Sequence, residues 1–545
     1  MRGRGCERGW SGVPETGWWR SRRPAGGWWD LPAWQLAAVS AVLGLALTAG
    51  AVTAAGPWDS GQRTAERARA AHGERGGGER HGGGLPGQPG GGVAPQATAV
   101  LAALDATAGS APPPTATGLG DALTPLLDDP ALGSRSSVAV ADALTGRIVH
   151  GTRRNAPVVP ASTIKIATAV AALSALGPDH RLTTEVVTGG GGEGDGKGGD
   201  GKGGDGTEEA GGKDAGEDGK SAARKRAAAG DGTIVLVGGG DPTLTARAAR
   251  GPGNPASLRD LADRTARALK EKDTRAVRLA YDTSRWSGKA RHSIGVNENI
   301  APVVPLSTDM GRLDDSVRGP APRSADPARD AAGTFAGLLR ERGITVSGKP
   351  RQATAGAGAE RLAAVRSMPV AALVERALTN SDNDIAEALA RETAVAAGVP
   401  ASFSGAGRAV RDRLAGLDLP LRGARFADGS GLDRDDRLTA ALLAQLLVRS
   451  ADPARPELRP VLTGLPVAGF SGTLRGRYTD ASAGTGMVRA KTGTLTGVNT
   501  LAGTVVDADG RLLSFAFVTN GSTDPHGAQT ALDRLASALA NCGCR

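Results

Sequence analysis

A short segment near the C-terminus, Val488–Leu495, constrains the fold of this chain more than any other. From Val488 to Lys491, apolar and basic residues alternate, which is the period of a β-strand with one covered face. Gly493 follows, and because glycine lacks a Cβ, a ligand or another stretch of backbone can lie directly against it. The segment therefore predicts a sheet edge that presents a cation, hydroxyls and N–H groups to a carboxylate, although Lys-Thr-Gly alone is a common tripeptide.

Ser162 and Lys165 stand three residues apart at the beginning of an Ala-rich segment, 166–173, that predicts a helix. Side chains with this spacing share one face of a helix, with Cβ atoms about 5–6 Å apart. A serine hydroxyl becomes a good nucleophile only when a base takes its proton. A lysine is such a base only when burial or a second cation, such as Lys491, lowers its pKa. By itself, the spacing is more typical of a helix cap followed by a lysine that extends into solvent.

Ser381, Asp382 and Asn383 form a polar tripeptide within a largely helical region, 369–397. The hydroxyl of Ser381 could relay a proton, and the amide of Asn383 could bind an amide of a substrate. Alone, the tripeptide would indicate a polar turn or the start of a helix.

Together, the three motifs occur in the order that class A β-lactamases and penicillin-binding proteins share: Ser-x-x-Lys, Ser-Asp-Asn and Lys-Thr-Gly. Over about residues 120–540, the chain resembles the D-alanyl-D-alanine carboxypeptidase/endopeptidase family, the class C low-molecular-mass penicillin-binding proteins. The local sequences that carry the resemblance are Pro160–Lys165, Gly239–Leu244, Ser381–Glu387, Asp428–Leu432, Gly472–Leu474 and Val488–Gly497.

The resemblance implies an α/β (α+β) fold of the β-lactamase/transpeptidase-like class, in which helices flank an antiparallel sheet. In this family additional domains are inserted between the Ser-x-x-Lys and Ser-x-Asn motifs, and the long separation of Lys165 and Ser381 leaves room for them. We therefore expect the transpeptidase-like domain in two parts at 119–186 and 365–545, separated by a low-complexity insertion at 187–230 and inserted domains at 231–364.

The resemblance also implies the chemistry. Ser162 attacks the carbonyl of a D-Ala-D-Ala bond in a peptidoglycan stem peptide, Lys165 takes its proton, and Ser381 passes a proton to the leaving D-Ala. Backbone N–H groups of Ser162 and Thr494 stabilise the oxyanion, and water then hydrolyses the acyl-enzyme. The residues expected to bind the substrate amide and the terminal carboxylate are Asn383, Lys491, Thr492, Gly493 and Thr494.

Stem peptides and β-lactams are thus the expected partners, and penicillin is expected to acylate Ser162 and remain bound. We expect no cofactor and no metal ion, because the six histidines form no HExxH or other ligand cluster in the sequence. Three alternatives stay open: a serine β-lactamase, an esterase on the same scaffold, and a catalytically inactive wall-binding protein. A β-lactamase would have a shorter gap between its first two motifs, and a binding protein would have no need of all the motif residues.

The N-terminal region predicts a membrane segment. Residues 1–33 are basic and are expected to remain cytoplasmic, whereas 34–56 carry no charge and are long enough to cross a bilayer as a helix. Small residues at 49–55 also resemble a signal-peptidase site, so a retained anchor and a cleaved signal are both open, and the length favours an anchor. Either alternative places the bulk of the protein outside the cytoplasm, membrane-anchored or secreted to the cell wall. Residues 57–118 are expected to be a disordered tether.

The net charge of +9 indicates a basic surface rather than a nucleic-acid partner, because the chain has no zinc-finger spacing and no basic stripe interleaved with aromatic residues. The three cysteines, Cys6, Cys542 and Cys544, build no disulfide framework. A one-residue gap gives poor disulfide geometry, which favours unpaired thiols at Cys542 and Cys544. The sequence specifies no oligomeric state.

Overall fold

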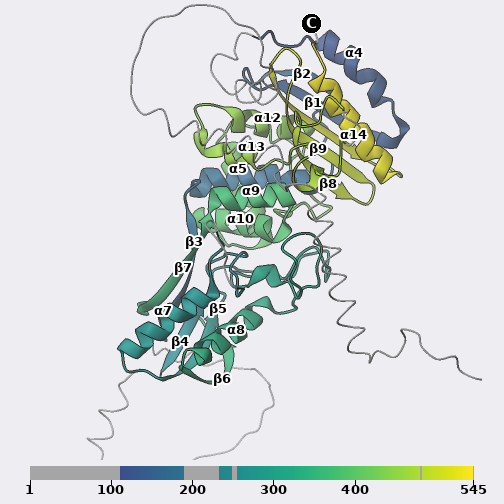
Figure 1. Ribbon diagram of the computed structural model, residues 1–545. Helices are drawn as coiled ribbons and strands as arrows, with labels where there is room; N and C mark the ends of the chain where they lie inside the picture. The colour runs from purple at the N-terminus through teal and green to yellow at the C-terminus, as the bar shows by residue number, and fades with distance from the viewer. Residues whose placement is uncertain (1–110, 190–231, 248–253, 479–481, 544–545) are drawn as a thin grey trace, which may run out of the picture. The chain divides into compact units, whose positions relative to one another are not determined.

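The computed structural model describes residues 111–189, 232–247, 254–478 and 482–543 (Figure 1). The predicted basic tail and membrane segment, and nearly all of the low-complexity insertion, lie outside these ranges. Among the described helices, none is both long enough and apolar enough to span a bilayer. Helix α4 (Ala116–Leu127) begins just before the predicted end of the tether, with the side chain of Thr115 as its N-cap.

The first sheet is built from both ends of the described chain (Figure 1). Its five strands lie in the order β2-β1-β10-β9-β8, and every pair is antiparallel. The strands are β1 (Arg135–Asp142), β2 (Ile148–Thr152), β8 (Arg489–Leu495), β9 (Val498–Val506) and β10 (Leu512–Asn520). In the sequence, the apolar segments 502–506 and 512–518 flank a turn at 507–510 and predict a hairpin, which the pairing of β9 and β10 confirms. The predicted strand that carries Lys-Thr-Gly is the edge strand β8.

Helices cover both faces of this sheet because its strands direct apolar side chains alternately to both. In β1, Val138 and Val140 pack with the apolar residues of α4 and α14 (Pro525–Ala540). Ala139 and Ala141 point the other way, into the larger helical core. The small alanines let helices approach this second face closely, and it is this face that carries the predicted helix of Lys165.

That helix, α5 (Ile164–Leu176), is buried from Ile164 to Leu173 and ends at Gly177. Its short side chains allow neighbouring helices to surround it. The helices that pack with it are α9 (Val370–Asn380), α10 (Asn383–Ala396), α11 (Phe403–Ala415) and α12 (Ala440–Ala451). The fold is thus the predicted β-lactamase/transpeptidase-like arrangement, with an antiparallel sheet flanked by helices.

The insertion between the first two motifs folds on a second, mixed sheet of order β6-β5-β4-β3-β7. Its strands are β3 (Arg181–Thr188), β4 (Thr233–Val237), β5 (Ala276–Asp282), β6 (Thr345–Gln352) and β7 (Arg361–Pro369). The pairs β4–β5 and β5–β6 are parallel, and β3 pairs antiparallel with β4 and β7. The apolar faces of α7 (Leu258–Glu271) and α8 (Pro327–Glu341) supply much of the core beside it.

Short helical turns complete the described chain: η2 (Pro130–Leu132), η3 (Ala161–Thr163), η4 (Asp309–Gly311), η5 (Pro456–Leu458), α13 (Pro460–Thr463) and η6 (Gly472–Leu474).

Near the C-terminus, Cys542 is disulfide-bonded, so the expectation that this thiol is unpaired is wrong.

Candidate active site

Ser162 lies in the single turn η3, which leads directly into α5. The preceding residue, Ala161, has a φ of 47°, a left-handed conformation that residues other than glycine rarely adopt. Two glycines pack tightly around this turn: a Cβ on Gly431 would overlap the carbonyl oxygen of Ala161, and a Cβ on Gly493 would lie 3.0 Å from the backbone nitrogen of Ser162. The turn that carries Ser162 is therefore held between the segments of two other motifs.

The Nζ of Lys165 contacts three oxygens and is almost completely buried, with the residue 1% exposed. It donates to Ser162 Oγ at 2.9 Å, to Asn383 Oδ1 at 2.7 Å and to the carbonyl oxygen of Ser430 at 2.6 Å. An ammonium group has three N–H donors, so all three are satisfied. In the neutral amine, two N–H groups still donate to Asn383 Oδ1 and to the carbonyl oxygen of Ser430. The nitrogen lone pair is then directed at the Ser162 hydroxyl.

Burial lowers the pKa of Lys165 to about 8, against the nearby charges of Asp428 and Glu387, which raise it. A usable fraction of the amine is therefore neutral near physiological pH. Lys491 is buried as well, and its burial together with the charge of Lys165 lowers the pKa of Lys491 well below its usual range. Lys491 thus lies close enough to Lys165 for the two charges to interact, but burial rather than Lys491 is what lowers the pKa of Lys165.

The Ser-Asp-Asn motif occupies the junction between α9 and α10. Ser381 takes a left-handed conformation, with φ of 57°, and Asp382 caps α10 by accepting from the N–H of Ile385. Asn383 bridges two parts of the fold, since its Oδ1 accepts from Lys165 while its Nδ2 donates to the carbonyl of Asn299 at 3.0 Å.

The Lys-Thr-Gly motif lies on the edge strand β8, beside η3. The Nζ of Lys491 is buried and donates to the carbonyl of Thr492 at 2.6 Å. The Oγ1 of Thr492 donates to the Oγ1 of Thr473 at 2.7 Å, which joins β8 to η6.

A cavity of about 420 Å³ joins the three motifs. Its lining includes the predicted site residues Ser162, Ser381, Asn383, Thr492 and Thr494. Lys165, Lys491 and Gly493 are not among the lining residues. Arg312 and Arg323, from the inserted region, also line this cavity. No sequence motif predicted that these two side chains belong to the site.

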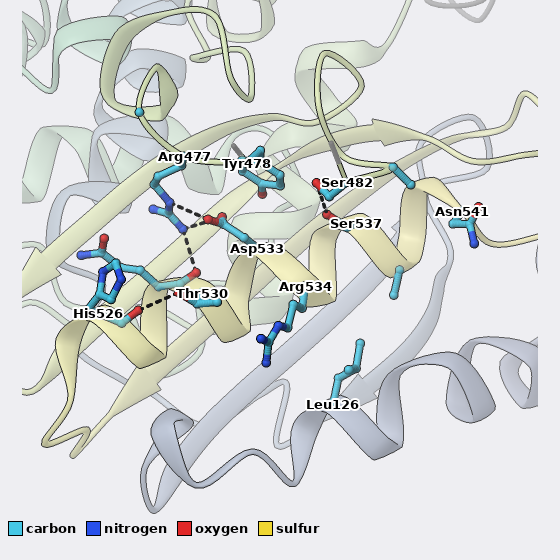
Figure 2. A pocket seen from close by; sticks show the side chains of 14 residues that line it. Leu126, Arg477, Tyr478, Ser482, His526, Thr530, Asp533, Arg534, Ser537 and Asn541 are labelled. Atoms are coloured by element: carbon cyan, nitrogen blue, oxygen red, sulfur yellow. Dashed lines mark hydrogen bonds and ion pairs between the residues drawn. The ribbon is translucent and has the colours of Figure 1, made fainter. Parts of the chain in front are cut away.

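A larger cavity of about 580 Å³ lies elsewhere, between α4, α14 and residues flanking Tyr478 (Figure 2). Its two central charged side chains, Arg477 and Asp533, pair at 2.6 Å. None of the three motifs contributes to its lining, so the smaller cavity is the candidate active site.

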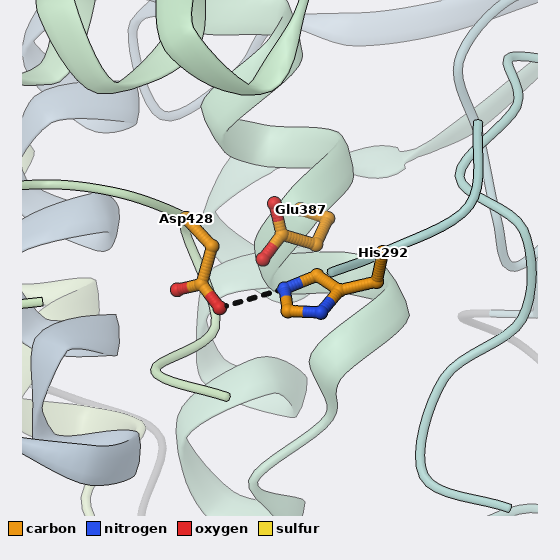
Figure 3. Close-up of side chains that lie close together, drawn as sticks. All are labelled: His292, Glu387 and Asp428. Atoms are coloured by element: carbon orange, nitrogen blue, oxygen red, sulfur yellow. Dashed lines mark hydrogen bonds and ion pairs between the residues drawn. The ribbon is translucent and has the colours of Figure 1, made fainter. Parts of the chain in front are cut away.

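His292, Glu387 and Asp428 form a buried cluster (Figure 3). The charges of Asp428 and Glu387 act on Lys165. The potential ligand atoms of all three cluster residues lie within 4.8 Å of one another, so among the described residues these three could hold a metal ion. However, the oxygens of Asp428 already accept from His292 Nε2, from the Ser430 hydroxyl and from three backbone N–H groups. We therefore assign the cluster a hydrogen-bonding role.

Besides Arg312 and Arg323, two further contributors to this site were missed from the sequence. The carbonyl of Ser430 is a backbone atom, and the only signal near it is the Asp428–Leu432 motif, which carried the resemblance without a role. His292 belongs to no motif, and nothing in the sequence pairs it with Asp428.

Comparison with known proteins agrees with this geometry. The family described as D-Ala-D-Ala carboxypeptidase 3 (S13) matches residues 119–204 and 311–542. Carboxypeptidase Rv3627c of Mycobacterium tuberculosis is 35% identical over 83% of this chain and 89% of its own length. The D-alanyl-D-alanine carboxypeptidase of an Actinomadura species is 30% identical over 75% of this chain and 82% of its own length.

The solved structure of penicillin-binding protein 4 from Haemophilus influenzae has the same fold, with a TM-score of 0.57. The match covers 77% of this chain and 98% of that protein, at 21% sequence identity.

Proposed function

The chain belongs to the S13 family of D-Ala-D-Ala carboxypeptidases and is a serine peptidase of that type; we propose that Ser162 is its nucleophile and Lys165 its general base. The observation that carries this assignment is the 2.9 Å contact between Lys165 Nζ and Ser162 Oγ at the wall of a cavity shared by all three motifs. This distance lies within the reach required of a base that abstracts the serine proton.

In the proposed reaction, Ser162 Oγ attacks the carbonyl carbon of the D-Ala-D-Ala bond of a stem peptide while its proton passes to Lys165 Nζ. The carbon–nitrogen bond then breaks, and the proton returns through Ser381 to the nitrogen of the leaving D-Ala. Water hydrolyses the acyl-enzyme and restores the serine. On cross-linked peptides the same steps would give endopeptidase activity. A β-lactam would likewise form an ester with Ser162 Oγ, through the carbonyl of its opened ring, and this ester would be hydrolysed slowly.

The oxyanion is proposed to bind between the backbone N–H groups of Ser162 and Thr494. The close approach of Gly493 to the nitrogen of Ser162 supports this assignment, because it brings β8 and η3 together with no side chain between them.

The terminal carboxylate of the substrate is proposed to lie against Thr492 and Thr494, which line the cavity. Lys491, which is buried and not part of the lining, would bind this carboxylate as well. Asn383 would bind the substrate amide while it orients Lys165.

The enzyme acts outside the cytoplasm, where peptidoglycan lies. We propose that residues 34–56 carry the chain across the membrane and either anchor it there or are cleaved. In this scheme the segment from residue 57 to the start of α4 acts as a tether between the membrane and the folded region, and the low-complexity segment between β3 and β4 forms a surface insertion.

Labelling with a fluorescent penicillin, beside the Ser162→Ala variant, tests the function. We expect a stable adduct on the purified chain and none on the variant. Rapid loss of the penicillin without an adduct would indicate a β-lactamase instead. With neither an adduct nor loss of penicillin, D-Ala release from a stem peptide would separate an enzyme blind to penicillin from an inactive binding protein.

A further inference from the structure

We infer that His292 is a positioning residue for Lys165, acting through Asp428 and the backbone turn at 428–431. This inference rests on the proposed role of Lys165 as the base. It assigns to the inserted region a part in the chemistry, because His292 lies on the segment between β5 and α8.

The turn at 428–431 is fixed by carboxylates on its inner side. Asp428 accepts from the N–H of Ser430 at 3.0 Å, from the N–H of Gly431 at 2.6 Å and from the Ser430 hydroxyl at 3.1 Å. Glu387, on α10, accepts from the N–H groups of Gly429 and Ser430 at 3.0 and 2.8 Å. With its N–H groups turned toward these carboxylates, the turn directs the carbonyl of Ser430 toward Lys165 Nζ, 2.6 Å away.

Asp428 is in turn held by His292, whose Nε2 lies 2.9 Å from Asp428 Oδ2 (Figure 3). The Nδ1 of His292 accepts from the N–H of Ile294 at 3.2 Å, so in the neutral ring the proton is on Nε2 and is donated to Asp428. The ring also packs edge-on against Phe403, with centroids 5.2 Å apart. His292 is 4% exposed, so its orientation is fixed by contacts rather than by solvent.

The consequence reaches Lys165 in two ways. The first is geometric, because a displaced Ser430 carbonyl would release one N–H of Lys165 and rotate the lone pair away from Ser162. The second is electrostatic, because Asp428 is the largest of the charges that raise the pKa of Lys165 against the effect of burial. A change at His292 thus alters the base without touching the substrate cavity, whose lining does not include His292.

The test compares two amides of different reach. In His292→Gln the side-chain nitrogen can take the place of the imidazole Nε2 and donate to Asp428, whereas in His292→Asn it stops short. The matched control is Arg285→Gln. This variant weakens the pair between Arg285, on the same inserted segment, and Glu392 on α10. Neither residue of this pair bonds to the turn at 428–431. Trp286 still donates to Glu392 in this control, at 2.8 Å.

The measurement is the reaction of each full-length chain with a fluorescent penicillin, resolved into the dissociation constant of the initial complex and the acylation rate constant. For His292→Asn we expect the acylation rate constant to fall to about one-tenth of its value in the unchanged chain, or lower. The dissociation constant should stay unchanged, because small misplacements of catalytic groups lower the rate rather than the binding. For His292→Gln and Arg285→Gln we expect a rate constant close to that of the unchanged chain. Melting temperatures are measured for all three.

Two results would overturn the inference: an unchanged acylation rate constant in His292→Asn, or an equal loss in Arg285→Gln, which would show that the loss comes from loosening of the inserted region. Failure of the unchanged chain to be acylated would instead contradict the proposed function, so the two failures are distinguishable.

Discussion

The side-chain nitrogen of Lys165 lies closer to the carbonyl oxygen of Ser430, at 2.6 Å, than to Ser162 Oγ, at 2.9 Å. The carbonyl cannot rotate independently of its backbone turn, whereas the serine hydroxyl can. Lys165 is therefore oriented mainly by groups that do not react, Ser430 and Asn383, and it presents its remaining position to the nucleophile. Such preorganisation is what a general base needs before substrate arrives.

Replacing Lys165 with Ala should reduce acylation by about 10²- to 10⁴-fold, because that is the usual contribution of a positioned base. The rate constant for labelling with a fluorescent penicillin measures this. Lys289→Ala, at an exposed lysine of the inserted region, is the control and should label normally. Acylation of the Lys165 variant at the normal rate would remove Lys165 from the role of base.

The acylation rate should rise with pH. The base acts when neutral, and burial lowers the pKa of Lys165 to about 8, so the fraction of active base grows as the pH increases through that value. A series of acylation rate constants from about pH 6 to about pH 10 should show a midpoint near 8. A rate that is constant over this range, with the fold intact, would contradict the assignment.

Gly431→Ala should lower both stability and acylation. Gly431 has a φ of 84°, and the added Cβ would overlap the carbonyl of Ala161, next to Ser162. The matched control is Gly333→Ala in α8, where a Cβ has nothing within 4 Å and should stabilise the helix by up to about 1 kcal/mol. The melting temperature should therefore fall in Gly431→Ala and rise in Gly333→Ala, and penicillin labelling should slow only in Gly431→Ala. Equal behaviour of the two variants would show that the close approach is unimportant.

The local sequence predicted those helices and strands in which one buried face sets the spacing of the apolar residues. The alternation around Lys491, the hairpin of β9 and β10 and the Ala-rich helix α5 all follow from residue spacing, and the three motifs placed Ser162, Lys165 and Asn383 together. The parallel pairing of β4, β5 and β6 was not predictable in this way, because pairing between distant strands leaves no local period.

The missed parts of the site have a similar explanation. The Ser430 carbonyl is a backbone group that any residue could supply, and only the fold of the turn around it makes it an acceptor. The pairing of His292 with Asp428 joins segments from different parts of the chain, and each residue alone has an ordinary sequence context. In contrast, the apolar spacing predicts the last helix over about 529–540, whereas α14 begins at Pro525. Asp524 caps this helix and Pro525 occupies its first position, which are local signals in the sequence.

Arg511→Met should destabilise the fold by about 3–5 kcal/mol, because it leaves the carboxylate of Asp142 buried without its partner. Asp142 is 1% exposed and accepts from Arg511 Nε at 3.1 Å and from its terminal nitrogen at 2.6 Å. Chemical denaturation measures the loss. Arg425→Met, which breaks the exposed pair with Asp435, is the control and should cost about 0–1 kcal/mol. Similar losses in the two variants would contradict the argument from burial.

Glu387→Gln should move the midpoint of the pH–acylation profile to lower pH. Glu387 is one of the charges that raise the pKa of Lys165, so its neutralisation makes the ammonium form less favourable and lowers that pKa further below about 8. Burial, with the charge of Asp428, raises the pKa of Glu387 itself to about 7, so at pH 8 most of this carboxyl is ionised and its replacement removes a real charge. The glutamine oxygen can still accept from the N–H groups of Gly429 and Ser430, which preserves the turn.

The matched control for this variant is Glu392→Gln, a second buried glutamate on α10 that pairs with Arg285 and is not among the main charges that act on Lys165. Its profile should keep the midpoint of the unchanged chain, whereas the Glu387 variant should acylate faster than the unchanged chain on the acidic side of the profile. An unchanged or higher midpoint in Glu387→Gln would show that the carboxylates beneath the turn shape its backbone without setting the charge of Lys165.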